Sequence, residues 1–295
     1  MEKEENKKIE GGLKITGRAQ KVSGVEKPLV SIITIVYNGE LHLEQTIKSV
    51  LAQTYENIEY IVIDGGSKDG SLGIVRKYED RIDYWMSEPD RGISDAMNKG
   101  VALANGDIVG MIHSDDWFGP DAVETAVGAM KNYGCDVFCG SLCYFKDEKA
   151  FFTDRSKPEK LRSYMSVWHP TVFLKNEAYK KEGTFDISFR SGMDYDLMLR
   201  LLTRGYKFAS VNRVISNMRT GGTSDQSWRR MLDEEYRIKV KNGLSGVGAS
   251  FDYYRKYPAY YTSEIVKKVL VALGLNFAVN FMKKLRNIID SRFIK

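Results

Sequence analysis

Two hydrophobic patterns alternate along residues 28–134. Apolar, β-branched runs are typical of buried strands, and they occupy residues 29–36, 58–64 and 107–112. Residues 82–88 predict a further short strand. Apolar residues that recur every three or four positions predict helices between these runs, over 42–53, 71–80, 93–106 and 120–134. The alternation of strand and helix predicts βαβ units, and with them an α/β fold with a Rossmann-like, mixed but mostly parallel sheet flanked by helices.

The parts of the chain before residue 28 and after residue 134 lack this regular alternation of strand and helix. Residues 1–27 are polar without an apolar period, which predicts either a flexible polar arm or a loosely docked first strand. Residues 136–145 and 150–154 are rich in β-formers and predict an antiparallel addition to the sheet. The pattern therefore predicts three parts, which are the arm, one α/β domain over 28–245 and a helical tail over 246–295.

The tail carries the excess charge of the chain. The net charge of +5 is too small to indicate nucleic-acid binding, and residues 252–295 hold nine basic and three acidic residues. One helical stripe of the tail is apolar and comprises Val266, Val269, Leu270, Leu273, Phe277, Phe281, Leu285 and Ile288. The 14 uncharged residues between Lys268 and Lys283 are too few for a membrane span, which needs about 20. We expect this basic amphipathic helix either to lie on an anionic membrane surface or to pack on protein, for example in a homodimer.

The cysteines and the first residues bear on the cellular compartment. Cys135, Cys139 and Cys143 have no other cysteine to pair with, which suits a reducing compartment. On a strand the three would share one face, which favours core packing over a metal or redox role. The first residues are charged and contain no apolar leader. We therefore expect a cytoplasmic protein, held peripherally on the inner face of the cell membrane if the tail binds lipid.

Polar side chains follow three of the predicted strands. Asn38, Asp64 and the pair Asp115 and Asp116 come directly after buried runs. Because ligands bind beyond the carboxyl ends of parallel strands, we expect these side chains to share one cleft. Two adjacent carboxylates at the end of a buried strand are costly unless a positive charge neutralises them. The segment GGSKDG after Asp64 allows close approach of a ligand, but it lacks the G-x-G-x-x-G spacing of a dinucleotide site.

Four segments, in order along the chain, carry a recognisable set of motifs. They read SIITIVYNGE, IVIDGGSKDGS, EPDRGISDAMNKGVALANGDIVGMIHSDDW and FRSGMDYDLMLRLLTRG. Together they resemble the family 2 glycosyltransferases over about residues 29–225, and most closely the bacterial members that extend O-antigen or exopolysaccharide units on a lipid carrier. The resemblance implies the GT-A fold. It also implies an inverting transfer of a single sugar from a UDP-sugar to a lipid-linked saccharide in cell-surface polysaccharide biosynthesis.

The resemblance implies a donor site built from several of these segments. Tyr37 and Asn38 would cradle the nucleotide base, with the Tyr37 ring available for stacking, and Asp64 would bond the uracil or the ribose. Arg91 and Asp95 lie in the segment that wraps the donor, and the forked, permanent charge of Arg91 suits a diphosphate. The alternatives are a simple Asp/Gly turn for Asp64 and a surface salt bridge for Arg91.

Asp115 and Asp116 match the D-x-D-type element of the family, written S-D-D in this chain. The match implies a divalent metal, Mn²⁺ or Mg²⁺, held by Asp116, with Asp115 on the ribose or sugar of the donor or on a metal-bound water. Such a cation would neutralise the charge that builds on the departing nucleoside diphosphate. Ser114 replaces the first Asp of the motif, which implies weaker metal binding. His113, at a position that is more often apolar, would pack or hydrogen-bond, or else join the metal shell.

Asp194 matches the catalytic base of the family, which takes the proton of the acceptor hydroxyl. Met193 stands where the family usually has Glu, so the acidic pair is incomplete. Asp196 is the second candidate for the base, and one of the two aspartates could instead cap a helix.

The remaining candidates concern the acceptor and the enzyme class. Trp117 and His169 are candidate acceptor contacts, with a structural turn before Pro170 as the alternative for His169. Arg219, Gly221 and Gly222 follow another predicted strand, near the place where the family closes the diphosphate site. The chain lacks a Q-x-x-R-W motif, which disfavours a processive synthase. A polyprenyl-phosphate sugar synthase and a non-catalytic nucleotide-sugar-binding protein stay open as alternatives.

Overall fold

The computed structural model describes residues 8–17, 21–146, 148–220 and 228–272. The chain forms two compact units, Met1–Ser224 and Asp225–Lys295. The first is an α/β unit, and the second contains two helices, α7 (Trp228–Lys241) and α8 (Gly246–Ala272). The predicted tail begins at residue 246, which is where α8 starts. Helix α7, which precedes it, contacts α8 and belongs to the same compact unit.

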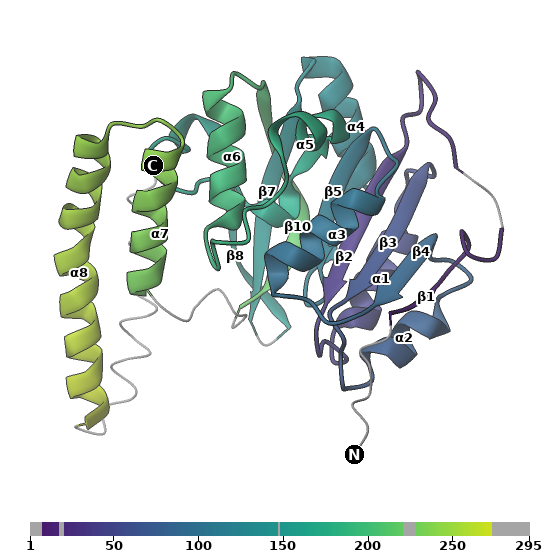
Figure 1. The fold of residues 1–295 in the computed structure, drawn as a ribbon, viewed down its shortest axis with the longest axis horizontal. Helices are drawn as coiled ribbons and strands as arrows, with labels where there is room; N and C mark the ends of the chain where they lie inside the picture. Colours follow the sequence, from purple (N-terminus) through teal and green to yellow (C-terminus); the bar gives the residue numbers. More distant parts are fainter. Residues whose placement is uncertain (1–7, 18–20, 147, 221–227, 273–295) are drawn as a thin grey trace. The chain divides into compact units, whose positions relative to one another are not determined.

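A mixed sheet forms the centre of the first unit (Figure 1). Its strands follow each other in the order β1-β4-β3-β2-β5-β9-β7-β10-β6, and β8 pairs with β7. Their bounds are β1 (Ile9–Gly11), β2 (Val30–Val36), β3 (Ile58–Asp64), β4 (Tyr84–Ser87), β5 (Ile108–His113), β6 (Trp117–Phe118), β7 (Val137–Lys146), β8 (Lys149–Arg155), β9 (Phe173–Lys175) and β10 (Phe208–Arg219). The helices are α1 (Leu43–Leu51), α2 (Ser71–Lys77), α3 (Ile93–Leu103), α4 (Ala122–Tyr133), α5 (Asn176–Glu182) and α6 (Met193–Thr203), with short 3₁₀ turns η1 (Pro158–Lys160) and η2 (His169–Thr171).

The pairing confirms the predicted mixed, mostly parallel sheet. β2 pairs in parallel with both β3 and β5, β3 pairs in parallel with β4, and β7 pairs in parallel with β10. β8 adds to β7 in the antiparallel sense, as residues 136–154 predict. The hydrophobic pattern does not predict β9, a three-residue strand that lies antiparallel between β5 and β7.

Both faces of the central strands are buried, which explains their continuous apolar sequence. Every residue of β2 and β3 is buried. Alternate residues such as Val30 and Ile32 join a core with Ile47 of α1 and Val123 of α4. On the other face α3 lies close to β2, because a side chain at Gly100 would collide with Ile33.

The cysteines lie in this core. Cys135 precedes β7, Cys139 and Cys143 belong to it, and all three are buried free thiols. Burial raises the pKa of Cys139 to about 12, so its sulfur stays a neutral thiol. This arrangement is the one that the core-packing interpretation predicts.

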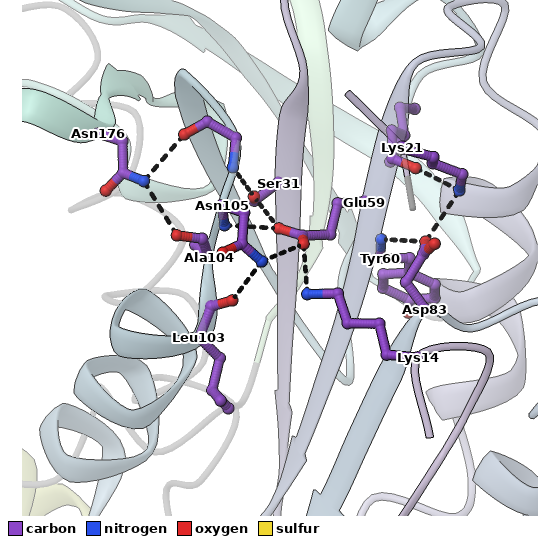
Figure 2. A network of polar contacts seen from close by, with 12 residues as sticks. Lys14, Lys21, Ser31, Glu59, Tyr60, Asp83, Leu103, Ala104, Asn105 and Asn176 are labelled. Carbon is purple, nitrogen blue, oxygen red and sulfur yellow. Dashed lines mark hydrogen bonds and ion pairs between the residues drawn. The ribbon is translucent and has the colours of Figure 1, made fainter. Parts of the chain in front are cut away.

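The sequence of residues 1–27 is compatible with either a flexible arm or a docked strand, and the structure shows a docked strand, β1. β1 pairs antiparallel with β4, with Ile9 opposite Ser87. Two ion pairs also attach this segment to the sheet. Figure 2 shows that Lys14 pairs with Glu59 and Lys21 with Asp83, two nearly buried carboxylates. Two lysines of the N-terminal segment thus supply counter-charges to acidic side chains of the sheet region.

In the second unit, α7 and α8 pack against each other through charged side chains. Lys239 of α7 is 2% exposed, and its ammonium lies 2.7 Å from Glu235 and 2.8 Å from Asp252 of α8. Lys256 of α8 lies 2.6 Å from the same Glu235 carboxylate. Buried charges of this kind require partners, so these ion pairs fix how α7 and α8 face each other.

Candidate active site

The carboxyl ends of β2, β3 and β5 bring the predicted polar residues to one edge of the sheet. In the strand register Val36 lies opposite Asp64, and Ile35 lies opposite His113. Asn38, Asp64 and Asp115 therefore leave three neighbouring strands at the same edge, as their positions after buried runs predict.

Asp64 is fixed by hydroxyl groups. Its side chain is 1% exposed, and its carboxylate accepts hydrogen bonds from the backbone N–H and the hydroxyl of Ser67. The hydroxyl of Ser87, at the end of β4, donates to it at 2.5 Å. These contacts hold the carboxylate in one orientation, and they include the turn hydrogen bond that a simple Asp/Gly turn would make.

Asn38 shapes the loop that carries Tyr37. Its backbone is left-handed, with φ of 50°, and its N–H donates to Ser67 Oγ at 2.8 Å. Its side-chain oxygen accepts from the N–H of Lys68 at 2.8 Å. Glu40 extends this pattern, since its carboxylate accepts from the N–H of Gly70 at 2.6 Å. The loop is thus tied to residues 67–70, and it leaves the Tyr37 ring 62% exposed and available for stacking.

Arg91 and Asp95 form an ion pair at the start of α3. The guanidinium lies 3.0 Å from the Asp95 carboxylate, and the Arg91 side chain is 73% exposed. This contact is the surface salt bridge that the sequence analysis gives as the alternative role of Arg91. An exposed pair of this kind contributes little stability. Asp90, which sequence reasoning does not single out, lies against Gly65 and leaves no room for a Cβ at that position.

The two adjacent carboxylates differ in burial. Asp116 is 3% exposed, whereas Asp115 is half-buried. Burial, together with the neighbouring Asp115 charge, raises the pKa of Asp116 well above its ordinary range. Arg219 offsets this only in part, because its contact with the Asp116 carboxylate is a backbone N–H at 3.3 Å. Arg219 is the nearby positive charge that the pair requires, yet it leaves the Asp116 charge incompletely neutralised.

The oxygens of Asp115 and Asp116 suit a hard divalent cation. Among the described residues, no group of three or more His, Cys, Asp and Glu side chains converges as a metal site. Mg²⁺-type sites are commonly built from one or two carboxylates, with phosphate oxygens and water completing the shell. A buried carboxylate that lacks a full counter-charge fits this pattern, so the residues present are compatible with a cation that arrives with a diphosphate.

His113 and His169 form a second, neutral pair. Their ring centroids are 5.8 Å apart. His113 Nε2 is buried, and within the described parts of the chain it has no hydrogen-bond partner. Burial lowers the pKa of His113, and burial together with His113 lowers the pKa of His169 to about 3. Both rings are therefore uncharged at neutral pH, which fits packing at the end of β5.

Trp117 lies beneath Arg219. The guanidinium is 4.6 Å from the centroid of the Trp117 ring, and Phe145 packs edge-on against the same ring at 4.6 Å. The guanidinium also lies 3.2 Å from the Glu148 carboxylate. Gly221 and Gly222, which follow Arg219, lie outside the described residues.

Asp194 and Asp196 occupy different environments in the first turn of α6. Asp194 is half-buried, whereas Asp196 is fully buried with its carboxylate 3.6 Å from the Arg200 guanidinium. The segment before α6 lies against α3, since Asn98 hydrogen-bonds both the N–H and the carbonyl of Phe185. The burial of Asp196 disfavours it as the base that meets an acceptor hydroxyl.

Sequence reasoning misses several residues that shape this edge. Thr46 of α1 hydrogen-bonds the loop that follows β5, Gln45 accepts from Arg219, and Glu148 pairs with Arg219. Of these three residues, only Thr46 is unusual in the sequence itself, because its hydroxyl lies on the apolar face of α1 formed by Leu43, Ile47 and Val50.

Comparison with known proteins identifies the fold and the family. The TarS protein of S. aureus, residues 1–349 in complex with UDP-GlcNAc, superposes with a TM-score of 0.63 at 16% identity, covering 76% of this chain and 70% of that one. The mannosyltransferase PcManGT from Pyrobaculum calidifontis, in complex with GDP-Man and Mn²⁺, superposes with a TM-score of 0.54 at 16% identity, covering 90% and 88%. These similarities confirm the GT-A fold.

Sequence relatives agree with the structural neighbours. An uncharacterized glycosyltransferase of Mycobacterium tuberculosis is 39% identical over 182 residues, which cover 59% of this chain and 68% of that protein. Chondroitin synthase of Escherichia coli is 29% identical over 232 residues, which cover 75% of this chain and 33% of that protein. The sequence model described as glycosyl transferase family 2 matches residues 31–202, a span that holds the ends of β2, β3 and β5 and the start of α6. The chain therefore belongs to glycosyltransferase family 2.

Proposed function

We propose that this glycosyltransferase is an inverting, metal-dependent enzyme that transfers a single sugar from a UDP-sugar to a lipid-linked saccharide in cell-surface polysaccharide biosynthesis. The observation that carries the proposal is the pair Asp115 and Asp116 at the end of β5, where the nearly buried Asp116 carboxylate lacks a full counter-charge. Asp64 at the end of β3, which β2 separates from β5, and the exposed Tyr37 ring after β2 would provide the polar and stacking contacts that a nucleotide needs.

Asp194 is the proposed base. In an inverting transfer the acceptor oxygen attacks the anomeric carbon opposite the leaving group, and the bond to the diphosphate breaks with its electron pair. Asp194 would accept the proton of the acceptor hydroxyl, and its half-buried position allows access while Asp196 stays buried beside Arg200. A divalent cation held by Asp116 would stabilise the charge that develops on the diphosphate. Trp117 and His169 remain the proposed acceptor contacts.

A donor screen tests this proposal. We expect the purified protein to release UDP from one UDP-sugar in the presence of Mn²⁺ or Mg²⁺, faster when a lipid-linked saccharide is added, and to lose this activity with a chelator. Asp116→Asn should reduce the release in the same assay. Release of GDP from a GDP-sugar would correct the donor class, and transfer to polyprenyl phosphate would identify the alternative enzyme. Nucleotide binding without release from any donor would identify a binding protein and overturn the proposal.

The second unit supports a peripheral location at the membrane. No described helix is both long and apolar enough to cross a bilayer. Beyond Tyr257, helix α8 nevertheless exposes large side chains, since Tyr261 and Ile265 are each 44% exposed, and the basic residues Lys267 and Lys268 follow in the sequence. Aromatic and basic side chains on one helix suit the headgroup region of an anionic leaflet. Of the apolar stripe in the tail, Leu273, Phe277, Phe281, Leu285 and Ile288 lie outside the described residues.

Vesicle sedimentation tests the membrane location. We expect the full chain to sediment with vesicles that contain anionic lipid and to stay in the supernatant with neutral vesicles. A chain cut after Tyr257 should no longer sediment, because it lacks the basic and apolar residues that follow. Equal sedimentation of both chains would contradict a membrane role for the tail. A full chain that is dimeric in solution and ignores lipid would favour packing on a second copy.

A further inference from the structure

The loop that carries Asp115 and Asp116 is held at its carbonyl groups by a buried threonine. Thr46 of α1 is fully buried, and its hydroxyl lies 2.6 Å from the carbonyl oxygen of Asp116 and 3.0 Å from that of Ser114. The N–H of Asp116 donates to the carbonyl of His113 at 3.1 Å, which closes the turn. A hydroxyl on the apolar face of a helix needs a partner, and this one has the backbone on both sides of Asp115.

Arg219 holds the carbonyl that Thr46 does not reach. At the end of β10 its Nη1 donates to the carbonyl of Asp115 at 2.8 Å. Its Nη2 donates to Gln45, the neighbour of Thr46 on α1, and its Nε faces Glu148 at 3.2 Å. The Trp117 ring lies under the guanidinium. Since its contacts fix both its position and the orientation of its plane, Arg219 can hold one carbonyl in a defined direction.

The single Thr46 hydroxyl proton has the Asp116 carbonyl as its nearest acceptor and the Ser114 carbonyl as a second one, while Arg219 donates to the Asp115 carbonyl. Two side chains from distant parts of the chain therefore hold the backbone of this loop. The backbone of an aspartate sets the direction of its Cα–Cβ bond and limits the rotamers that its carboxylate can adopt. We propose that Thr46 and Arg219 are positioning residues that orient the Asp115 and Asp116 carboxylates toward the cation and the donor diphosphate. This inference rests on the proposed function, because it concerns how the same two carboxylates are presented.

The inference predicts a loss of metal affinity without a loss of fold. Removing a group that orients a metal ligand commonly weakens metal binding by about 10- to 100-fold. Thr46→Val keeps the shape of the side chain and removes the donor, whereas Thr46→Ser keeps the donor. Arg219→Lys keeps the charge and removes the fork that binds the Asp115 carbonyl.

Mn²⁺ binding by the full chain in the presence of UDP, followed by electron paramagnetic resonance of free Mn²⁺, tests the inference. We expect Thr46→Val and Arg219→Lys to weaken Mn²⁺ binding about 10-fold or more and Thr46→Ser to bind within a few-fold of the wild type. The matched control is Thr34→Val, which removes a fully buried hydroxyl that contacts Tyr60 instead of this loop. It should bind Mn²⁺ like the wild type.

The outcomes separate this inference from the proposed function. If the wild type binds Mn²⁺ with UDP and both Thr46→Val and Arg219→Lys bind equally well, the positioning role is wrong while the proposed function stands. The same conclusion follows if Thr34→Val weakens binding as much as Thr46→Val, because the effect would then reflect general destabilisation. If the wild type binds no Mn²⁺ with UDP, the metal-dependent function fails and this inference fails with it. Should Thr46→Val not fold, Arg219→Lys decides alone.

Discussion

Asp194→Asn is expected to lower the rate of sugar transfer by about 100- to 10,000-fold, the range that a general base contributes. The amide has nearly the shape of the carboxylate but cannot accept the proton of the acceptor hydroxyl. Because Asp194 lies in the first turn of α6, away from β3 with Asp64 and from the loop after β5 with Asp116, UDP binding should persist. The measurements are the initial rate of UDP release with acceptor and the affinity for UDP by calorimetry.

Asp196→Asn is the matched control for this prediction. Asp196 is two residues away on the same helix, but it is fully buried beside Arg200. Its loss should lower the melting temperature, while the folded fraction of the enzyme keeps most of its transfer rate. An unchanged rate in Asp194→Asn would remove Asp194 from the mechanism, and a large selective loss in Asp196→Asn would move the base to Asp196.

The regular part of the fold follows from the sequence because its strands are buried on both faces. Runs such as 29–36 and 58–64 consist mainly of apolar and β-branched residues, which favours central parallel strands. The positions of Asn38, Asp64 and Asp115 after such strands then predict their common edge, because parallel neighbours end together.

Short strands and long-range contacts leave weaker signals. β1 and β9 have three residues each, too few for a period, and their pairing depends on what the rest of the sheet leaves open. The contact of Arg219 with the Asp115 carbonyl joins positions 104 residues apart. The sequence predicts that Arg219 follows a strand, but only the tertiary structure decides which carbonyl it meets.

The N-terminal segment makes stabilising contacts that the hydrophobic pattern of the sequence does not predict. Its lack of an apolar period is consistent with a flexible arm, yet Lys14 lies 2.5 Å from Glu59, whose side chain is 4% exposed. Asn105 donates to the Glu59 carboxylate through its backbone N–H and its side chain, each at 2.8 Å, and Ser31 donates to it as well (Figure 2). A polar segment can therefore be part of the fold when it supplies the counter-charge of a buried acid.

Lys14→Met should lower the free energy of unfolding by about 3 kcal/mol at neutral pH, because it leaves Glu59 buried without a cation. This value lies at the lower end for a broken buried pair, since the Lys14 side chain is 30% exposed. Glu59→Gln in the Lys14→Met background should recover part of the loss by removing the unpaired charge. The matched control is Lys27→Met, whose partner Glu56 is 82% exposed, and it should cost less than about 1 kcal/mol. Equal losses in the two lysine variants, measured by urea unfolding, would contradict the structural role of Lys14.

The pH dependence of the free energy of unfolding provides an independent test of the contact between Lys14 and Glu59. Burial alone would raise the pKa of Glu59, but the hydrogen bonds from Lys14, Ser31 and Asn105 outweigh it and hold the pKa below the ordinary value of 4.5. A carboxyl whose pKa is lowered in the folded state stabilises the fold above its unfolded pKa and loses this contribution as the pH falls through the folded value. Without Lys14, burial shifts the pKa of Glu59 upward, so the variant takes up a proton on Glu59 at a higher pH than the wild type does. The stability difference between wild type and Lys14→Met should therefore be largest at neutral pH and shrink steadily as the pH falls from there through the lowered pKa of the wild-type Glu59. A difference that is independent of pH would mean that Lys14 stabilises the protein by packing, and not through the charge of Glu59.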